Sequence, residues 1–182
     1  PIGSCEQHGQ HRPLDTDTRI ASALAQSLAE SFADGDVLIT PAFSITASGE
    51  HQSFPGTLSL GAAVFEQVIM ELVRSAEWSA GVVLVNGHGG NIPARNRVVE
   101  VSNQLPDLQA RWYDWWLAHS VQEVAEKHNL KPSHANWLEA FPFTLVSEVP
   151  AEPKVPPTYQ GLLNAKDTRK VFGDGNYGGP YK

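Results

Sequence analysis

The hydrophobic and polar positions along the chain follow two periods, one typical of helices and one of buried strands. Apolar residues recur at helical spacing in four segments: 17–32, 60–78, 95–105 and 116–128. Continuous apolar, β-prone runs that predict buried strands occupy residues 37–40, 81–85 and 108–113. Because strands and helices alternate, we predict an α/β fold, a three-layer sandwich with a mainly parallel central sheet.

Two further segments lack a clear period. Residues 44–57 are rich in Ser, Gly, His and Pro and predict a long loop, which in a compact domain is usually functional. Beyond Ser147 the chain becomes rich in Pro and then, towards Lys182, in Gly. This composition predicts irregular, surface-lying structure with little helix.

The length and charge of the chain limit the classes of protein to which it can belong. Its 182 residues suit a single domain, 1–182, and the abrupt start at Pro1 is compatible with a missing N-terminal strand and, likewise, a missing C-terminal end. The net charge of -7, with 13 basic residues, argues against nucleic acid or an anionic membrane as partner. The single cysteine, Cys5, fits a reducing cytosol. We therefore expect a cytoplasmic protein.

The candidate chemistry begins in the opening segment. Glu6 and His8 are two residues apart, so in an extended segment both side chains point to the same face. Asp17 follows a proline turn, and His88 and Glu139 lie further downstream. Three carboxylates and two imidazoles are too many for one zinc ion and suit a dinuclear metal site.

Each of these residues has a plainer interpretation. Asp17, at the start of a helix, is equally suited to be its N-cap. His88 lies in a glycine-rich turn between strand and helix, but this turn lacks the spacing and the lysine of a phosphate-binding loop. Glu139 would be an ordinary surface carboxylate, except that its neighbours are apolar and a buried carboxylate there needs a cation or donors.

Four motifs taken together resemble the creatininase family of metal-dependent amidohydrolases. They are residues 1–9 (PIGSCEQHG), 13–17 (PLDTD), 86–91 (NGHGGN) and 134–139 (HANWLE). Residues 48–51 (SGEH), 54–57 (FPGT) and 173–181 (GDGNYGGPY) are most similar to the branch of that family associated with mycofactocin biosynthesis. The resemblance implies a peptidase that releases a C-terminal fragment from a modified precursor peptide.

The resemblance also implies how the site is organised. Glu6 and His88 would hold one of two divalent ions, zinc, iron or manganese, while His8 and Glu139 hold the other and Asp17 bridges them. Creatininase itself has its second-metal glutamate two residues after the loop histidine, where this chain has Gly90. This difference argues against creatinine as the substrate. His134 and Glu139 would lie beside the reacting bond.

Several other residues are weaker candidates. We expect His11 at the rim of the site and His51 in the loop over it, whereas His119 and His128 are surface residues. Ser4 and Cys5 lack an assigned base, so we interpret them as packing residues rather than nucleophiles. The aromatic run of Trp112, Tyr113, Trp115 and Trp116 predicts core packing or a subunit contact, and alternatively an apolar wall for a substrate.

Two other functions remain compatible with the sequence. The chain could hydrolyse a small cyclic or formylated amide, as an amidohydrolase or deformylase. It could instead be a metal-stabilised binding subunit without turnover. Family resemblance further implies a homo-oligomer, with a peptide or small amide as the other partner.

Overall fold

Two parallel strands form the centre of the molecule. This computed structural model describes residues 1–33, 36–105 and 107–182. Strand β1 (Gly81–Asn86) pairs in parallel with β2 (Gln109–Asp114), so the strands predicted at 81–85 and 108–113 are confirmed. Both strands end at the same edge of the sheet, where the loops that follow them meet.

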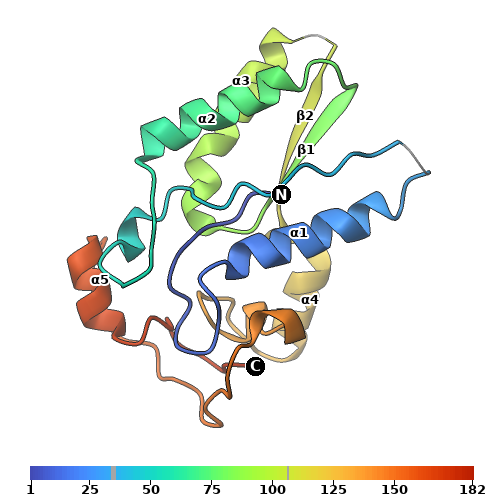
Figure 1. The fold of residues 1–182 in the computed structure, drawn as a ribbon. Helices are drawn as coiled ribbons and strands as arrows, with labels where there is room; N and C mark the ends of the chain where they lie inside the picture. The colour runs from blue at the N-terminus through green and yellow to red at the C-terminus, as the bar shows by residue number, and fades with distance from the viewer. Residues whose placement is uncertain (34–35, 106) are drawn as a thin grey trace.

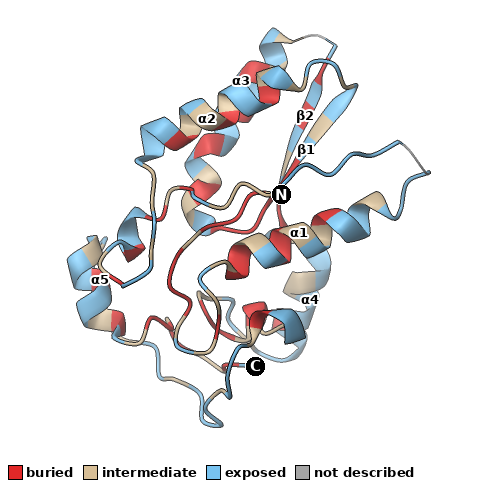
Figure 2. Ribbon diagram, in the orientation of Figure 1, coloured by how far each residue is buried: buried red, intermediate tan, exposed pale blue. Residues whose placement is uncertain are grey.

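The opening segment of the chain extends this sheet on the other side of β1. The backbone N–H of Ile2 donates to the carbonyl of Val85 at 2.8 Å, and that of Gly3 donates to the carbonyl of Phe43 at 2.9 Å. Ile2 forms parallel bridges with both Phe43 and Asn86. The first residues are therefore buried in the middle of the molecule, as the red opening segment in Figure 2 shows.

Helices cover both faces of the sheet (Figure 1). The α-helices are α1 (Thr16–Ala29), α2 (Ala62–Ser75), α3 (Arg95–Gln104), α4 (His119–Lys127) and α5 (Ala165–Phe172). Leu84 packs with Phe65 and Val98 of α2 and α3, whereas the adjacent Val85 packs with Ala21 of α1 on the opposite face. Each large apolar side chain buried in this way stabilises the fold by about 1.5–3 kcal/mol. The predicted α/β layers are confirmed.

Short 3-10 turns lie mostly in the loops between these elements. They are Gly49–His51, Gly89–Ala94, Trp115–Leu117, Trp137–Glu139 and Pro142–Thr144. Among the described residues, no helix is both long and apolar enough to cross a membrane.

The buried strand predicted at 37–40 is wrong. Leu38 is 74% exposed, and Val37 and Ile39 are exposed as well. No strand pairs with this run in the described part of the chain, and parallel pairing begins only at Phe43. An apolar run becomes a core strand only where a neighbouring element covers it, and the run itself does not carry that information.

The surface-lying end predicted beyond Ser147 is wrong in two respects. Helix α5 begins at a cap, because the side chain of Asn164 accepts hydrogen bonds from the backbone N–H groups of Lys166 and Asp167. After it, the glycine-rich closing segment turns inward, and Asn176 and Tyr181 are 1% and 7% exposed. The end of the chain therefore contributes to the interior.

Candidate metal centre

The five predicted ligands meet at the carboxyl edge of the sheet. Glu6 and His8 come from the opening segment, and His88 lies two residues after β1. Asp17 belongs to the first turn of α1, and Glu139 ends the turn Trp137–Glu139. All five are buried, with exposed fractions between 0% and 8%.

Gly87 brings the loop after β1 against the start of α1. A Cβ atom at this position would lie 2.3 Å from the carbonyl oxygen of Asp17, closer than any side chain permits. Only glycine therefore allows this approach, which places His88 beside Asp17.

The carboxylate of Asp17 faces an imidazole with each of its oxygens. Oδ1 lies 3.0 Å from Nε2 of His8, and Oδ2 lies 3.1 Å from Nδ1 of His88. The hydroxyl of Ser4 donates to Oδ2 at 2.8 Å, which fixes the orientation of the carboxylate. The N-cap position of α1 is Asp15, so the interpretation of Asp17 as a cap is wrong.

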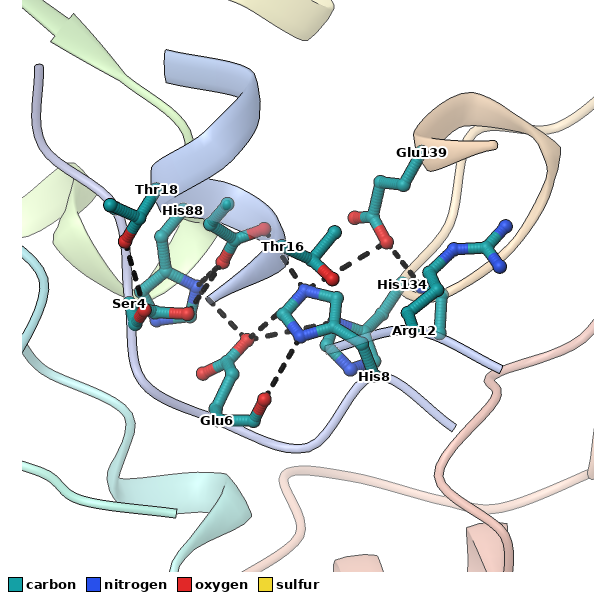
Figure 3. Close-up of polar contacts among 12 residues, drawn as sticks. Ser4, Glu6, His8, Arg12, Thr16, Thr18, His88, His134 and Glu139 are labelled. Atoms are coloured by element: carbon teal, nitrogen blue, oxygen red, sulfur yellow. Dashed lines mark hydrogen bonds and ion pairs between the residues drawn. The ribbon is translucent and has the colours of Figure 1, made fainter. Parts of the chain in front are cut away.

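The remaining two carboxylates lie on opposite sides of Asp17, one with each imidazole. Oε1 of Glu6 is 3.2 Å from Nδ1 of His88, and Oε2 of Glu139 is 3.8 Å from Nε2 of His8. Figure 3 shows Glu6 between His88 and His8, with Glu139 approaching from the far side. Among the described residues, three groups of potential ligands have their atoms within 4.8 Å of one another: Glu6, Asp17 and His88; His8, His134 and Glu139; and Glu6, His51 and His134. Asp17 belongs to the first group and contacts the second through His8.

Backbone carbonyl groups fix the orientation of both rings. Nδ1 of His8 lies 3.0 Å from the carbonyl oxygen of Glu6, and Nε2 of His88 lies 3.1 Å from that of Ala47. A ring nitrogen that donates to a carbonyl leaves the lone pair of the other nitrogen free for a metal. In both rings, the free nitrogen is the one that faces Asp17.

The charges of this cluster shift its pKa values strongly. Burial disfavours the charged form of His8, but the carboxylates of Asp17 and Glu139 outweigh it and raise its pKa to about 10. Burial likewise opposes ionisation of Asp17, yet His8 and His88 hold its pKa well below the usual range. Burial raises the pKa of Glu139 to about 7. Without a metal, the imidazoles therefore carry protons that offset the carboxylates.

Glu6 provides the test of whether these residues fit a metal. Its side chain is fully buried, and within the described residues its charge is offset only by imidazoles, of which His88 is nearest at 3.2 Å from Oε1, while Oε2 has no hydrogen-bond partner. A buried carboxylate without donors is costly unless a cation neutralises it. Carboxylate oxygens and imidazole nitrogens are ligands of divalent zinc, manganese and iron, so the residues fit such ions.

His134 lies beside the cluster, as predicted for a residue near the reacting bond. Its Nε2 is 2.8 Å from the carbonyl oxygen of Gln7, and its Nδ1 is 3.6 Å from Oε1 of Glu6. Burial, followed by the positive charge of His8, lowers its pKa well below the usual value. The ring is therefore neutral.

A cavity of about 220 Å³ opens over the cluster. Trp115 and Trp116 form part of its lining, together with Glu50, His51 and His134. Trp115 also belongs to a core cluster with Ile20 and Leu138, whereas Trp112 packs against the main core. The aromatic run thus has both predicted roles: Trp112 and Trp115 pack in the core, and Trp115 and Trp116 line the cavity.

Sequence reasoning underestimated His51 and missed Gln7. His51 is 1% exposed, with Nδ1 at 2.9 Å from the side-chain nitrogen of Gln7 and Nε2 at 3.8 Å from Oε1 of Glu6. The sequence did contain a signal for Gln7. It is a polar residue between two candidate ligands, so in an extended segment its side chain points to the opposite face. The expectation of surface positions for His119 and His128 is confirmed, while His11 packs against Tyr181.

Comparisons with known proteins agree with this geometry. The family description "Creatininase: Creatinine amidohydrolase" matches residues 1–182. A mycofactocin precursor peptide peptidase of Mycolicibacterium smegmatis is 53% identical over 98 residues, which cover 52% of this chain and 40% of that protein. A creatinine amidohydrolase of Pseudomonas putida is 31% identical over 98 residues, 50% of this chain and 36% of that protein.

Each matched region thus spans less than half of the curated relative. A solved structure described as "Creatininase Mn" superimposes with a TM-score of 0.77 at 19% identity, covering 100% of this chain and 79% of that one. This likeness establishes the fold, and the family match extends over every residue of the chain. The chain belongs to the creatininase family.

Proposed function

We propose that this chain carries the metal centre of a hydrolase that cleaves a peptide bond in a modified precursor peptide and releases a C-terminal fragment. The observation that carries the proposal is the position of Asp17, whose two oxygens face His8 and His88 at 3.0 and 3.1 Å. A carboxylate shared in this way suits two divalent ions. The choice of substrate is supported by the relative that is 53% identical, a mycofactocin precursor peptide peptidase.

In this proposal, Glu6 and His88 would hold one ion, His8 and Glu139 would hold the other, and Asp17 would be a ligand available to both. When bound, zinc, iron or manganese would supply a water of lowered pKa and a Lewis acid for the amide carbonyl. The protein holds its ligands with fixed ring orientations before any ion arrives, because carbonyl groups already bind the outer nitrogens of both histidines.

His134 is the proposed proton carrier. Its Nε2 is held by the carbonyl of Gln7, so the lone pair of Nδ1 faces the cluster. Because the ring is neutral, Nδ1 can accept a proton during attack on the amide and pass it to the leaving nitrogen. Glu139, whose Oε2 lies 3.8 Å from Nε2 of His8, is the second residue proposed to lie beside the reacting bond, and it would act there as a metal-bound carboxylate.

The direct test is cleavage of a synthetic precursor peptide by the metal-loaded chain, followed by mass spectrometry. We expect release of a C-terminal fragment with zinc, iron(II) or manganese. Glu6→Gln should lower the rate by at least about a hundredfold, because it removes a ligand charge. The matched control is Glu123→Gln, whose side chain is 63% exposed on α4. Equal cleavage by Glu6→Gln and the control would contradict the proposal.

A second candidate function is hydrolysis of a small cyclic or formylated amide. The modest cavity of about 220 Å³ favours a small substrate, and the Pseudomonas putida relative carries the name creatinine amidohydrolase. Gly90 stands where creatininase has a metal-binding glutamate, which disfavours creatinine itself. Turnover of a panel of small amides, with the peptide uncleaved, would select this function. Metal and peptide binding without any turnover would indicate a binding subunit.

Two expectations from the sequence stay predictions. They are a cytoplasmic location and assembly into a homo-oligomer. Light scattering of the purified protein would test the assembly, and fractionation of the source cells would test the location.

A further inference from the structure

Gln7 lies between two proposed metal ligands but points away from them. It is 6% exposed, although glutamine usually lies at the surface. Its side-chain oxygen accepts a hydrogen bond from the backbone N–H of Gly9 at 3.0 Å, and its side-chain nitrogen lies 3.2 Å from the carbonyl oxygen of Gly175. These two contacts determine which end of the amide is nitrogen.

The side-chain nitrogen of Gln7 has two hydrogens and three neighbouring acceptor positions. Besides the Gly175 carbonyl, the other two are Nδ1 of His51 at 2.9 Å and Nε2 of His134 at 3.3 Å. Nε2 of His134 lies closer to the backbone carbonyl of Gln7, at 2.8 Å, and donates to it. A nitrogen that donates cannot also accept, so the two hydrogens go to His51 and Gly175.

Gln7 therefore determines the tautomers of two adjacent histidines. Neutral His51 accepts at Nδ1, so its proton is on Nε2. Neutral His134 donates from Nε2, so its Nδ1 carries a lone pair. The two ring centroids are 4.5 Å apart, and the freed atoms lie 3.8 and 3.6 Å from Oε1 of Glu6. The nearest acceptor of the Nε2–H of His51 is Oε1 of Glu50 at 3.3 Å, so Glu50 favours the same tautomer as Gln7 does. One donor, shared with Glu50, and one acceptor consequently lie side by side at the cluster.

The glycine-rich closing segment, residues 173–181, holds Gln7 in place. Gly175 has a φ of +90°, and a Cβ atom there would lie 1.5 Å from the side-chain oxygen of Gln7. The ring of Tyr177 packs against the rings of His134 and His51, with centroids 5.0 and 5.6 Å away. The segment thus contacts both histidines and the residue that orients them.

Lys154 anchors this segment from outside. Its ammonium group donates to the carbonyl oxygen of Phe172 at 2.8 Å and to that of Asn176 at 2.6 Å, and it pairs with the carboxylate of Asp174. The backbones of Lys154 and Gly179 also exchange hydrogen bonds, at 3.1 and 2.8 Å. Lys154 therefore holds the closing segment on both sides of Gly175, the residue that contacts Gln7.

We propose that Gln7, supported by the closing segment, is a positioning residue that keeps His134 as a proton acceptor and His51 as an N–H donor towards the substrate amide. This role rests on the proposed hydrolase function. In it, Nδ1 of His134 takes a proton, while the N–H of His51 donates a hydrogen bond to the oxygen of the amide under attack.

The test is the protonation of individual ring nitrogens, read by NMR on zinc-loaded protein labelled with 15N-histidine. The signals of His51 are assigned by their loss in His51→Gln. In the unmodified protein, we expect a protonated Nε2 and an unprotonated Nδ1. In Gln7→Glu, the new carboxylate has no hydrogen to donate and can only accept, so Nδ1 of His51 should become protonated while Nε2 keeps its proton beside Glu50. With a cleavable substrate, kcat should fall at least about tenfold while KM changes less.

Gly175→Ala provides an independent arm, because the atoms nearest to its added Cβ are those of the Gln7 side chain. We expect the same change in the His51 signals as in Gln7→Glu. The matched control is Gly161→Ala: Gly161 has a φ of +70°, so alanine is strained there too, but nothing lies within 4 Å of its Cβ position. The control should leave the signals unchanged.

A proton on Nδ1 of His51 in the unmodified protein would overturn the inference. So would signals that Gln7→Glu and Gly175→Ala leave unaltered in folded protein. These outcomes are separate from the proposed function. If the tautomers are as described but no amide is cleaved, the hydrolase proposal fails while the positioning of the rings stands.

Discussion

Nδ1 of His88 lies 3.1 Å from Oδ2 of Asp17, although one residue follows a strand and the other begins a helix. The contact depends on Gly87, which lets the loop after β1 touch the backbone of Asp17. The metal centre is therefore a property of how the sheet edge and α1 pack, and not of either element alone.

Gly87→Ala should separate His88 from Asp17. Its Cβ would lie 2.3 Å from a backbone oxygen, which cannot move as a flexible side chain does. We expect a loss of about 1–3 kcal/mol in the free energy of unfolding and weaker metal binding. Gly89→Ala is the control, since nothing lies within 4 Å of its Cβ position. Thermal melts and metal titrations of both variants provide the measurement, and equal behaviour would argue against this role of Gly87.

Metal binding should release protons. The neighbouring carboxylates raise the pKa of His8 to about 10 against the effect of burial and also raise that of His88, so both rings are protonated near neutral pH without metal. An ion must displace these protons, so its affinity should fall as the pH falls. Calorimetric titrations in buffers of different ionisation enthalpy measure the number released. Binding heats that do not depend on the buffer would contradict the prediction.

The same shift affects the stability of the metal-free protein. Folding raises the pKa of His8 from 6.5 to about 10, so protonation of this ring stabilises the folded state. This stabilisation is fully present below pH 6.5 and is lost as the pH rises towards about 10. Bound metal should abolish this dependence, since the ring is then neutral.

Trp115 and Trp116 should respond differently to truncation. Trp115 is 6% exposed and belongs to a core cluster, so Trp115→Ala should cost about 3–5 kcal/mol of stability. Trp116 is only partly buried and lines the cavity, so Trp116→Ala should mainly raise KM. Denaturant unfolding combined with steady-state kinetics distinguishes the two. If both variants lost similar stability and kept unchanged kinetics, Trp116 would not contact the substrate.

Much of this centre follows from local sequence patterns. Glu6 and His8 share a face because strand residues alternate, and His88 follows the clearest apolar run, which ends at the sheet edge. The choice between cap and ligand for Asp17 could not be made from the sequence, because an aspartate at a helix start suits both roles. In the structure the N-cap position belongs to Asp15, and Asp17 instead faces His8 and His88, which approach from other elements.

Other features depend on distant contacts that no local pattern encodes. Gln7 meets His51 and Gly175 only because the loop and the closing segment fold against the opening segment. The apolar run 37–40 resembles a core strand yet is exposed, since in the described part of the chain no strand pairs with it. Helix α5 is short and lies in a region rich in Pro and Gly, so its Asn164 cap was the available signal.

The most direct test of the account is the metal content of Asp17→Asn compared with Asp15→Asn. Both replace an aspartate at the start of α1, but Asp15 is half exposed and pairs with Arg19, whereas Asp17 lies between the two imidazoles. Elemental analysis should find about two divalent ions per chain in the unmodified protein and in Asp15→Asn, and about one or fewer in Asp17→Asn. Retention of both ions by Asp17→Asn would contradict the shared-carboxylate centre.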